Sequence, residues 1–125
     1  MQKKINTEKA PGALGPYSQA VEIDNLVYTS GQLGIDPVTG EMPEGVEAQA
    51  KLALENVKAI LAEAGLEMSS IIKTLVFIKD MNDFAALNEI YATYFTGDFP
   101  ARSCVEVARL PKDVLIEIEA IGIKG

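Results

Sequence analysis

The sequence predicts an α+β fold of order ββαβαββ, a mixed sheet with two helices packed on one face. Apolar residues recur at spacings of three and four in two segments, which is the period of an amphipathic helix. Segments rich in β-branched and aromatic residues precede, separate and follow those two, so the helices are expected to connect parallel strands. The 125 residues, 48% of them hydrophobic and 23% charged, suit a single domain spanning 1–125.

The N-terminal part is predicted to form an irregular segment followed by a hairpin. Prolines and glycines interrupt any regular pattern in residues 1–19. Ala20–Ile23 and Leu26–Ser30 are expected to be strands, because each is rich in residues that favour sheets. The Asp24-Asn25 pair between them is typical of a tight two-residue turn. The second strand is expected to continue to about Leu33.

Two helices are predicted, on either side of a strand. Val46 to Ala64 carries the clearest helical pattern, and Gly65 is well placed to follow its last turn in a left-handed conformation. Ile71–Lys79 is expected to be a strand. A second helix is expected to begin with Asn82 as its N-cap and to end at Gly97. Its apolar stripe, read as core or interface, consists of Phe84, Leu87, Tyr91, Tyr94 and Phe95.

The C-terminal segments Ser103–Arg109 and Val114–Ile123 complete the predicted sheet. The short Leu110–Asp113 connection between them favours an antiparallel pair. Side chains alternate between the two faces of a strand, and in each segment one face is more apolar than the other. We expect those apolar faces, which carry Val105 and Ile118, to meet the helices.

The strand at 71–79 is apolar on both faces, as in a strand that is buried on both sides. Two helices cover only one face of the sheet, so we expect further copies of the chain to cover the other. Arg102, Glu117 and Glu119 lie on the more polar faces of their strands and are candidates for a site between subunits, because interfacial charges are costly unless paired or used. The alternative, favoured by spacing alone, is an Arg–Glu ion pair that only sets the register.

The composition excludes several kinds of active site. The chain has no His, which rules out a Ser-His-Asp triad and a His-ligated metal. Its single Cys cannot form a disulfide within the chain or a CxxC motif. No secretory signal and no run of about 18 apolar residues is present, so a cytoplasmic location without membrane insertion is expected. The net charge of −7 argues against nucleic acid as the main partner.

Five motifs follow one another along the chain, from about residue 5 to residue 123. They are Gly15–Ala20, Thr29–Gln32, Asp36–Glu41, Val76–Asp80, and Phe99–Pro111 followed by Ile116–Glu119. Any one of them would be weak evidence. Together and in order, they resemble the RidA (YjgF) family, the enamine/imine deaminases.

The resemblance implies a fold, an assembly and a reaction. Members of the RidA (YjgF) family have chorismate-mutase-like subunits that form a homotrimer with a barrel-like core and three clefts between subunits. They hydrolyse 2-iminobutanoate and 2-iminopropanoate, which arise from enamines released by PLP-dependent serine and threonine dehydratases, to 2-keto acids and ammonia. The family uses no metal and no organic cofactor. The Thr96–Asp98 connection is shorter than in many members, which affects the expected rim of the cleft.

The resemblance also implies roles for particular residues. Arg102 matches the family's essential arginine, whose planar fork suits a substrate carboxylate. Glu117 matches the cleft glutamate, which orients or deprotonates water or, alternatively, only pairs with Arg102. Tyr17 would close the cleft with its hydroxyl, or else pack at an interface. Ser30 and Gly31 would contact the ligand, Gly31 through its N–H, and a β-bulge is the alternative there.

Asn88 and Cys104 are the remaining substrate-binding candidates. Asn88 matches a family cleft contact, and its alternative is a solvated helix residue. Cys104 is expected to pack as a small buried side chain with its backbone near the ligand, because the sequence offers no clear general base to activate its thiol. Glu119 is expected to be structural.

Two other functions compete with the deaminase. A regulatory trimer that binds keto acids or amino acids without turnover would use the same cleft. An endoribonuclease-type translation inhibitor is also attributed to the family, but the acidic charge and the absence of His and basic runs argue against it. Ligand binding without turnover would indicate the first, and RNA cleavage that depends on Arg102 would indicate the second.

Overall fold

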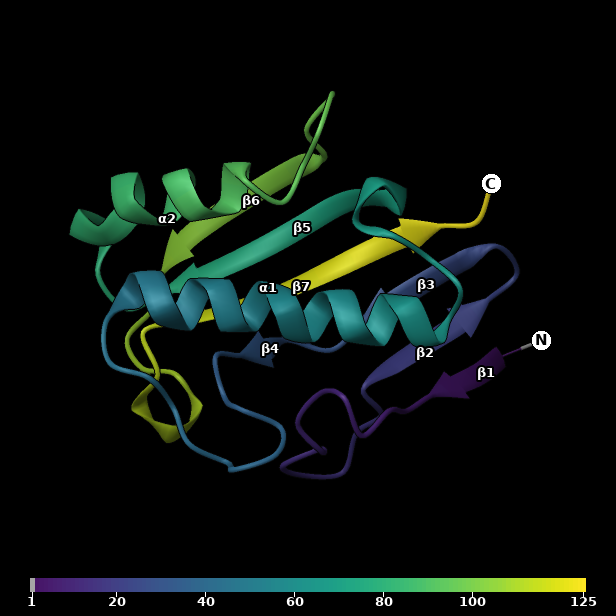
Figure 1. The fold of residues 1–125 in the computed structure, drawn as a ribbon, viewed down its shortest axis with the longest axis horizontal. Coiled ribbons are helices and arrows are strands. Elements are labelled where there is room, and N and C mark those ends of the chain that lie inside the picture. Colours follow the sequence, from purple (N-terminus) through teal and green to yellow (C-terminus); the bar gives the residue numbers. More distant parts are fainter. Residues whose placement is uncertain (1) are drawn as a thin grey trace.

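A computed structural model describes residues 2–125 as one seven-stranded mixed sheet with both α-helices on one face (Figure 1). The strand order is β1-β2-β3-β7-β5-β6, and β4 also pairs with β7. The helices are α1 (Val46–Glu63) and α2 (Phe84–Ala92). The strands are β1 (Gln2–Ile5), β2 (Ala20–Ile23), β3 (Leu26–Thr29), β4 (Gln32–Leu33), β5 (Ile71–Ile78), β6 (Ala101–Glu106) and β7 (Ile116–Ile123). The α+β fold with two helices on one side is as predicted.

The N-terminal segment is more regular than the sequence indicates. Residues Gln2–Ile5 form β1, which pairs antiparallel with β2, so the expectation of an irregular segment is wrong there. Three of the four side chains of β1 are exposed, and an edge strand of this kind has no hydrophobic pattern to reveal it. The β2–β3 hairpin is confirmed: Ile23 pairs with Leu26, and Asp24 adopts φ +53° in the turn.

Helix α1 has the predicted extent and the predicted end. Gly65 adopts φ +79°, and its N–H donates to the Ala62 carbonyl at 3.0 Å. The Leu66 N–H donates to the Leu61 carbonyl at 2.8 Å, which completes a Schellman end and brings Leu66 into the core. No helix in residues 2–125 is long and apolar enough to cross a membrane.

The second helix is shorter than predicted at both ends. Asn82 is not its N-cap, because Asp80 caps a preceding 3-10 turn by accepting from the Asn82 N–H at 2.9 Å. Helix α2 ends at Ala92, well before Gly97. The N–H groups of Thr93 and Tyr94 donate to the carbonyls of Ile90 and Tyr91, both at 3.1 Å, so the helix closes in a tightened turn. The Thr93 hydroxyl also donates to the Ile90 carbonyl, at 2.6 Å.

The second predicted strand is interrupted by a bulge. Both β3 and β4 pair with β7: Tyr28 lies opposite Ile121, and Gln32 lies opposite Ile118. The chain advances four residues from Tyr28 to Gln32, whereas β7 advances only three from Ile118 to Ile121. One extra residue therefore lies in the segment 29–31. This bulge carries two of the residues that the sequence singles out for ligand contact.

The predicted antiparallel pairing of the last two strands is wrong. β6 is parallel to β5, and β7 is antiparallel to β5 on its other side. The connection between them crosses the end of β5: the Val107 N–H donates to the Ile78 carbonyl at 2.9 Å, and the Lys79 N–H donates to the Leu115 carbonyl at 3.0 Å. A short connection is compatible with a step over one strand as well as with a hairpin. The parallel β5–α2–β6 unit is the expected crossover.

The two faces of the sheet are covered differently. The helices bury one face, and the main core there includes Val27, Leu54, Leu61, Val76, Ile78, Leu87, Ile116 and Ile118. The opposite face, called the open face below, leaves Tyr28 and Val105 each 43% exposed. A smaller core under the connection from β6 to β7 covers one end of it, and consists of Leu33, Ile35, Leu110 and Val114.

The faces of β6 are the reverse of those predicted. Arg102 pairs with Thr74, and Cys104 pairs with Val76, both on the helix side of β5. Val105 lies instead on the open face. Because β6 is an edge strand, its apolar side need not face the core of its own subunit, and alternation alone does not tell which side turns inward.

Candidate active site

A hollow of about 650 Å³ opens beside the bulge, on the open face of the sheet. Tyr17, Ser30, Gly31 and Glu117 line it together, and we call these four residues the glutamate cluster. They come from the N-terminal loop, the bulge and β7, so the fold gathers them from distant parts of the sequence. The other lining residues are Leu14, Gly15, Pro16, Thr29, Leu33, Pro111 and Glu119.

The Glu117 side chain lies directly over the backbone of Gly31. A Cβ atom at residue 31 would stand 2.7 Å from Cδ and 2.8 Å from Cγ of Glu117, closer than such atoms approach. Glycine is required here for close approach. Burial, and then the charge of Glu119, raise the pKa of the Glu117 carboxyl above its ordinary value. A carboxylate of this kind is suited to accept a proton and return it.

The loop that carries Tyr17 is held by the buried side chain of Gln19. The Gln19 amide oxygen accepts from the Thr7 N–H at 2.6 Å. Its amide nitrogen donates to the carbonyl of Pro11 at 2.8 Å and to that of Ala10 at 3.3 Å. One side chain therefore ties the segment from Thr7 to Pro11 to the start of β2.

Tyr17 and Ser30 are both engaged in local hydrogen bonds. The Tyr17 hydroxyl accepts from the Leu14 N–H at 2.9 Å, which leaves its own proton free to donate. The Ser30 hydroxyl donates to the Ser18 carbonyl at 2.7 Å, so its oxygen remains only as an acceptor. Tyr17 is 45% exposed and stands at the mouth of the hollow.

Arg102 lies on the other face of the sheet, against helix α2. Its guanidinium carbon is 4.8 Å from the ring centroid of Tyr91 and 5.4 Å from that of Phe84. Within residues 2–125 no carboxylate forms an ion pair with it, and the salt bridges there are Arg109–Asp113 and Lys124–Glu22. A guanidinium that is stacked but unpaired is available for a carboxylate.

Asn88 and Cys104 accompany Arg102, and we call these three the arginine cluster. Asn88 follows Phe84 by one turn of α2, and its Oδ1 is buried without a hydrogen-bond partner among the described residues. Cys104 lies on the same face of β6 as Arg102 and packs against the main core. Burial raises the pKa of its thiol despite the nearby Arg102 charge, which suits packing and not a nucleophile.

The seven predicted site residues thus form two clusters on opposite faces of one subunit. The expectation that Arg102 and Glu117 share the uncovered face is wrong, because β6 presents Arg102 to α2. An Arg102–Glu117 ion pair within one subunit is excluded by the same arrangement.

Comparisons with known proteins cover almost the whole chain. A family model described as Endoribonuclease L-PSP matches residues 7–124. The 2-iminobutanoate/2-iminopropanoate deaminase of Escherichia coli K12 is 58% identical over 127 residues, 99% of each chain. This chain belongs to the RidA/YjgF family. Crystal structures of E. coli TdcF with bound serine and of the E. coli YjgF gene product align with TM-scores of 0.96 and 0.95 at 55% and 56% identity, covering 98% of this chain and 99% of theirs.

Sequence reasoning misses three neighbours of the arginine in this RidA/YjgF chain: Thr74, Phe84 and Tyr91. It assigns the two aromatic residues to the apolar stripe of a helix and Thr74 to a buried strand. The spacing of Phe84, Asn88 and Tyr91 does place all three on one helical face. Nothing in the sequence shows that Arg102 packs against that face.

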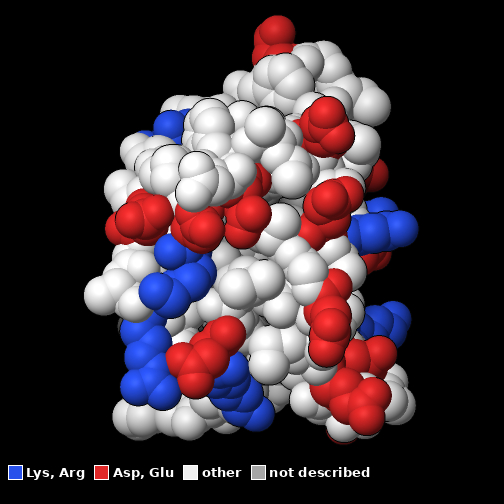
Figure 2. Space-filling model, turned by 90° about the vertical axis from the view of Figure 1, so that its left-hand side faces the viewer, with Lys and Arg blue, Asp and Glu red and all other residues white. Residues whose placement is uncertain are grey.

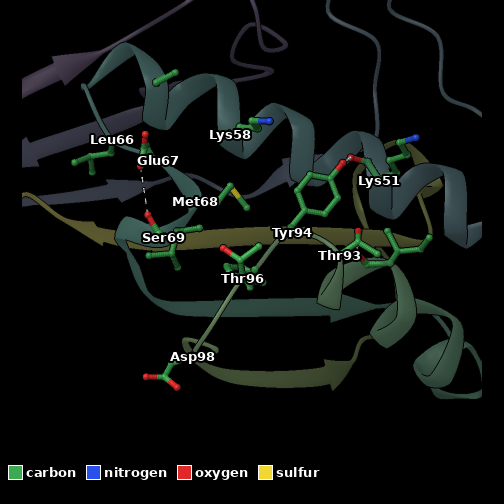
Figure 3. Close-up of a pocket in the computed structure, with 14 residues that line it drawn as sticks. Lys51, Lys58, Leu66, Glu67, Met68, Ser69, Thr93, Tyr94, Thr96 and Asp98 are labelled. Carbon is green, nitrogen blue, oxygen red and sulfur yellow. Dashed lines mark hydrogen bonds between the residues drawn. The ribbon is translucent and has the colours of Figure 1, made fainter.

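A larger hollow of this RidA/YjgF chain than the one beside the bulge lies on the helix layer. It is a groove of about 910 Å³ between α1, α2 and the segment 93–98 (Figure 3). Tyr94 stands in it, and its hydroxyl donates to the Glu55 carboxylate at 2.6 Å. None of the predicted site residues lines this groove. In the described part of the chain, no three acidic, Cys or His side chains gather as they would around a metal ion.

Proposed function

We propose that this chain is a cofactor-independent hydrolytic deaminase of reactive 2-imino acids and their enamines. Its substrates are 2-iminobutanoate and 2-iminopropanoate, and its products are 2-keto acids and ammonia. The observation that carries the proposal is the stacked, unpaired guanidinium of Arg102, an anchor for a carboxylate, in a chain 58% identical to a protein named for this activity. PLP-dependent serine and threonine dehydratases would supply the substrates.

The complete site lies between subunits in this proposal. Arg102 stands on β6, at one edge of the sheet, whereas Glu117 lies on the open face. Contact between two different surfaces is heterologous, and such contacts form a ring when the rotation between subunits closes. A homotrimer with a barrel-like core satisfies this requirement. It would also cover the exposed Tyr28 and Val105.

The proposed reaction divides between the two clusters. Arg102 binds the substrate carboxylate through two N–H groups of its guanidinium. This contact fixes the C=N carbon near Glu117 of the neighbouring subunit. Glu117 takes a proton from water while the water oxygen bonds to that carbon. Glu117 returns that proton to the nitrogen, which gives the carbinolamine. It then carries the hydroxyl proton to the nitrogen as well, so the C–N bond breaks and ammonia leaves as the carbonyl forms. One water is consumed and one ammonia is released for each imine.

The remaining site residues bind and orient in this scheme. The buried, unpartnered Oδ1 of Asn88 would accept a hydrogen bond from the substrate nitrogen. Tyr17, whose hydroxyl proton is free, would donate to the ligand at the mouth of the cleft. The bulge at Ser30 and Gly31 would bring backbone close to the substrate. Cys104 would pack beside the substrate, next to Arg102.

A coupled assay tests the proposal. A PLP-dependent threonine dehydratase generates 2-iminobutanoate, semicarbazide traps it, and the release of 2-ketobutyrate is followed. We expect the wild-type protein to accelerate this release and Arg102→Ala to lose about 100-fold or more. The matched control is Arg109→Ala, which removes an exposed arginine paired with Asp113 and should retain full activity. Equal rates with wild type, Arg102→Ala and no protein would reject the deaminase.

Binding without turnover is the principal alternative. In that case the wild-type protein would bind 2-ketobutyrate or an amino acid, Arg102→Ala would not, and neither would change the rate of imine hydrolysis. The crystal structure of TdcF with bound serine is compatible with either outcome, since serine carries the same carboxylate. The assay above therefore separates the enzyme from a regulatory trimer.

Endoribonuclease activity has less physical support. Figure 2 shows Asp and Glu side chains spread over one end of the molecule and lying beside its Lys and Arg side chains, without a continuous basic surface on that face. Binding to phosphates depends on clustered Lys and Arg. RNA cleavage that persists through repurification and is lost in Arg102→Ala would favour this function instead.

A further inference from the structure

Thr74, Tyr91 and Arg102 form a closed triangle of contacts between two strands and a helix. Thr74 and Arg102 are direct partners in the parallel β5–β6 pair. The Thr74 Oγ1 atom is 2.7 Å from the Tyr91 hydroxyl oxygen. The Tyr91 ring centroid is in turn 4.8 Å from the guanidinium carbon of Arg102. The ring beside the arginine is therefore tied to the neighbouring strand of the sheet.

This ring has little freedom to move. Tyr91 is 5% exposed and Thr74 is 1% exposed. Each hydroxyl is the hydrogen-bond partner of the other, and a buried hydroxyl left without a partner is costly. Phe95 packs on Tyr91 with 4.8 Å between ring centroids. These contacts hold the ring in one orientation.

Stacking holds Arg102 without using its hydrogen-bond donors. The N–H groups of a guanidinium point outward in its plane, whereas an aromatic ring contacts its face. Burial raises the pKa of the Tyr91 phenol above its ordinary value, so the phenol stays neutral and does not compete with a ligand for the positive charge. Within residues 2–125 the guanidinium of Arg102 forms no ion pair, so its donors are left for a planar anion.

We propose that Tyr91, fixed by Thr74, is a positioning residue that presets the guanidinium plane of Arg102 for the carboxylate of the substrate. The proposal rests on the proposed function in one respect, that Arg102 is the carboxylate anchor. Neither Thr74 nor Tyr91 touches the reacting atoms. Presetting reduces the freedom that the arginine loses when a ligand binds. Loss of the Thr74–Tyr91 hydrogen bond should therefore weaken carboxylate binding and leave proton transfer at Glu117 unchanged.

The test compares variants that each remove one hydroxyl. Tyr91→Phe and Thr74→Val break the hydrogen bond between the two hydroxyls, whereas Thr74→Ser keeps a hydroxyl that can form it. The matched control is Tyr94→Phe, which removes a hydroxyl that donates to the Glu55 carboxylate at 2.6 Å. Tyr94 stands in the groove of Figure 3, which Arg102 does not line. The readouts are the Kd of 2-ketobutyrate, and the NMR resonance of the Arg102 Nε–Hε group, assigned by its absence in Arg102→Ala.

We expect Tyr91→Phe and Thr74→Val to raise the Kd by about fivefold, which corresponds to about 1 kcal/mol. The KM for the imine should rise in parallel, while kcat stays within about twofold of wild type. The Arg102 resonance should shift and broaden in both variants. Thr74→Ser and Tyr94→Phe should resemble the wild type in every readout.

The Arg102 resonance is the decisive measurement because it requires no reaction. An unchanged resonance in both Tyr91→Phe and Thr74→Val would overturn the proposal. An equal effect of Tyr94→Phe would also overturn it, since that would indicate a general loosening of the fold. If the wild type hydrolyses no imine but the Arg102 resonance still shifts in Tyr91→Phe and Thr74→Val, the positioning role is retained and the deaminase is rejected.

Discussion

Arg102 and Glu117 lie on opposite faces of the same sheet. On the shared neighbour β5, Arg102 lies opposite Thr74 and Glu117 lies opposite Phe77. Side chains alternate along a strand, so positions 74 and 77 point to opposite sides. A site that uses both the guanidinium and the carboxylate must take them from two subunits.

Mixed oligomers test this arrangement. Arg102→Ala and Glu117→Gln subunits, unfolded together at equal amounts and refolded, should recover about one quarter of wild-type activity in a cyclic trimer. The reason is that a site is intact only where a Glu117→Gln subunit presents its arginine to an Arg102→Ala subunit. Each variant refolded alone should remain at background. The measurement is imine hydrolysis per subunit in the coupled assay.

A second mixture serves as the control for subunit exchange. Wild type refolded with the double variant Arg102→Ala/Glu117→Gln should also show about one quarter of full activity if sites are shared. About one half would be retained if each site belonged to one subunit. Co-purification of an untagged variant with a tagged one shows that the subunits have mixed; one half in this mixture of mixed trimers, together with no recovery in the first, would refute the intersubunit site.

Gly31 and Gly34 are a matched pair with different neighbours. A Cβ atom at residue 31 would meet the flexible side chain of Glu117, whereas one at residue 34 would stand 2.7 Å from the Cα of Gln49 in helix α1. Gly31→Ala should therefore fold normally and lose about 100-fold in activity, because Glu117 is displaced. Gly34→Ala should lose about 2 kcal/mol of stability, because helix backbone cannot give way easily.

Thermal denaturation and the coupled assay together check the glycine pair. The expected pattern is an active-site defect for Gly31→Ala with little change in Tm, and a large fall in Tm for Gly34→Ala. Full activity in a folded Gly31→Ala protein would mean that the position of Glu117 is unimportant for the reaction.

The pH dependence should report the environment of Glu117. Burial and the charge of Glu119 raise the pKa of Glu117, and the proposed reaction requires its ionised form. Activity should fall as pH drops through that raised pKa. Glu119→Gln removes the negative neighbour and lowers the pKa of Glu117, so the acidic limb should move to lower pH. A limb that stays in place, or moves to higher pH, in the kcat/KM profile would contradict this assignment.

Gln19 should control the order of the loop that carries Tyr17. Gln19→Ala removes the hydrogen bonds to Thr7, Ala10 and Pro11 and should cost about 2 kcal/mol of local stability. Hydrogen exchange of residues 7–18 should accelerate, and imine hydrolysis should fall with it. The exposed Gln2→Ala is the matched control. Unchanged protection of the loop in Gln19→Ala would show that other contacts hold it.

Much of the fold could be predicted because its signals are local. The period of α1, Gly65 after its last turn, and the Asp24-Asn25 hairpin are each written in a few consecutive residues, and the structure bears them out. The end of α2 and the polar strand β1 could not be predicted in this way. The tightened turn at Thr93 and Tyr94 ends the first, and pairing with β2 forms the second.

The sequence by itself determined the α+β class, the extent of α1 and membership of the RidA/YjgF family, since these depend on period, composition and motif order. Only the tertiary structure decided that β6 lies beside β5 and turns Arg102 toward Tyr91. The physical reason is that alternation along a strand has a period of two. Turning an edge strand over exchanges the faces of every side chain without changing the pattern, so only its neighbours settle which side faces the core.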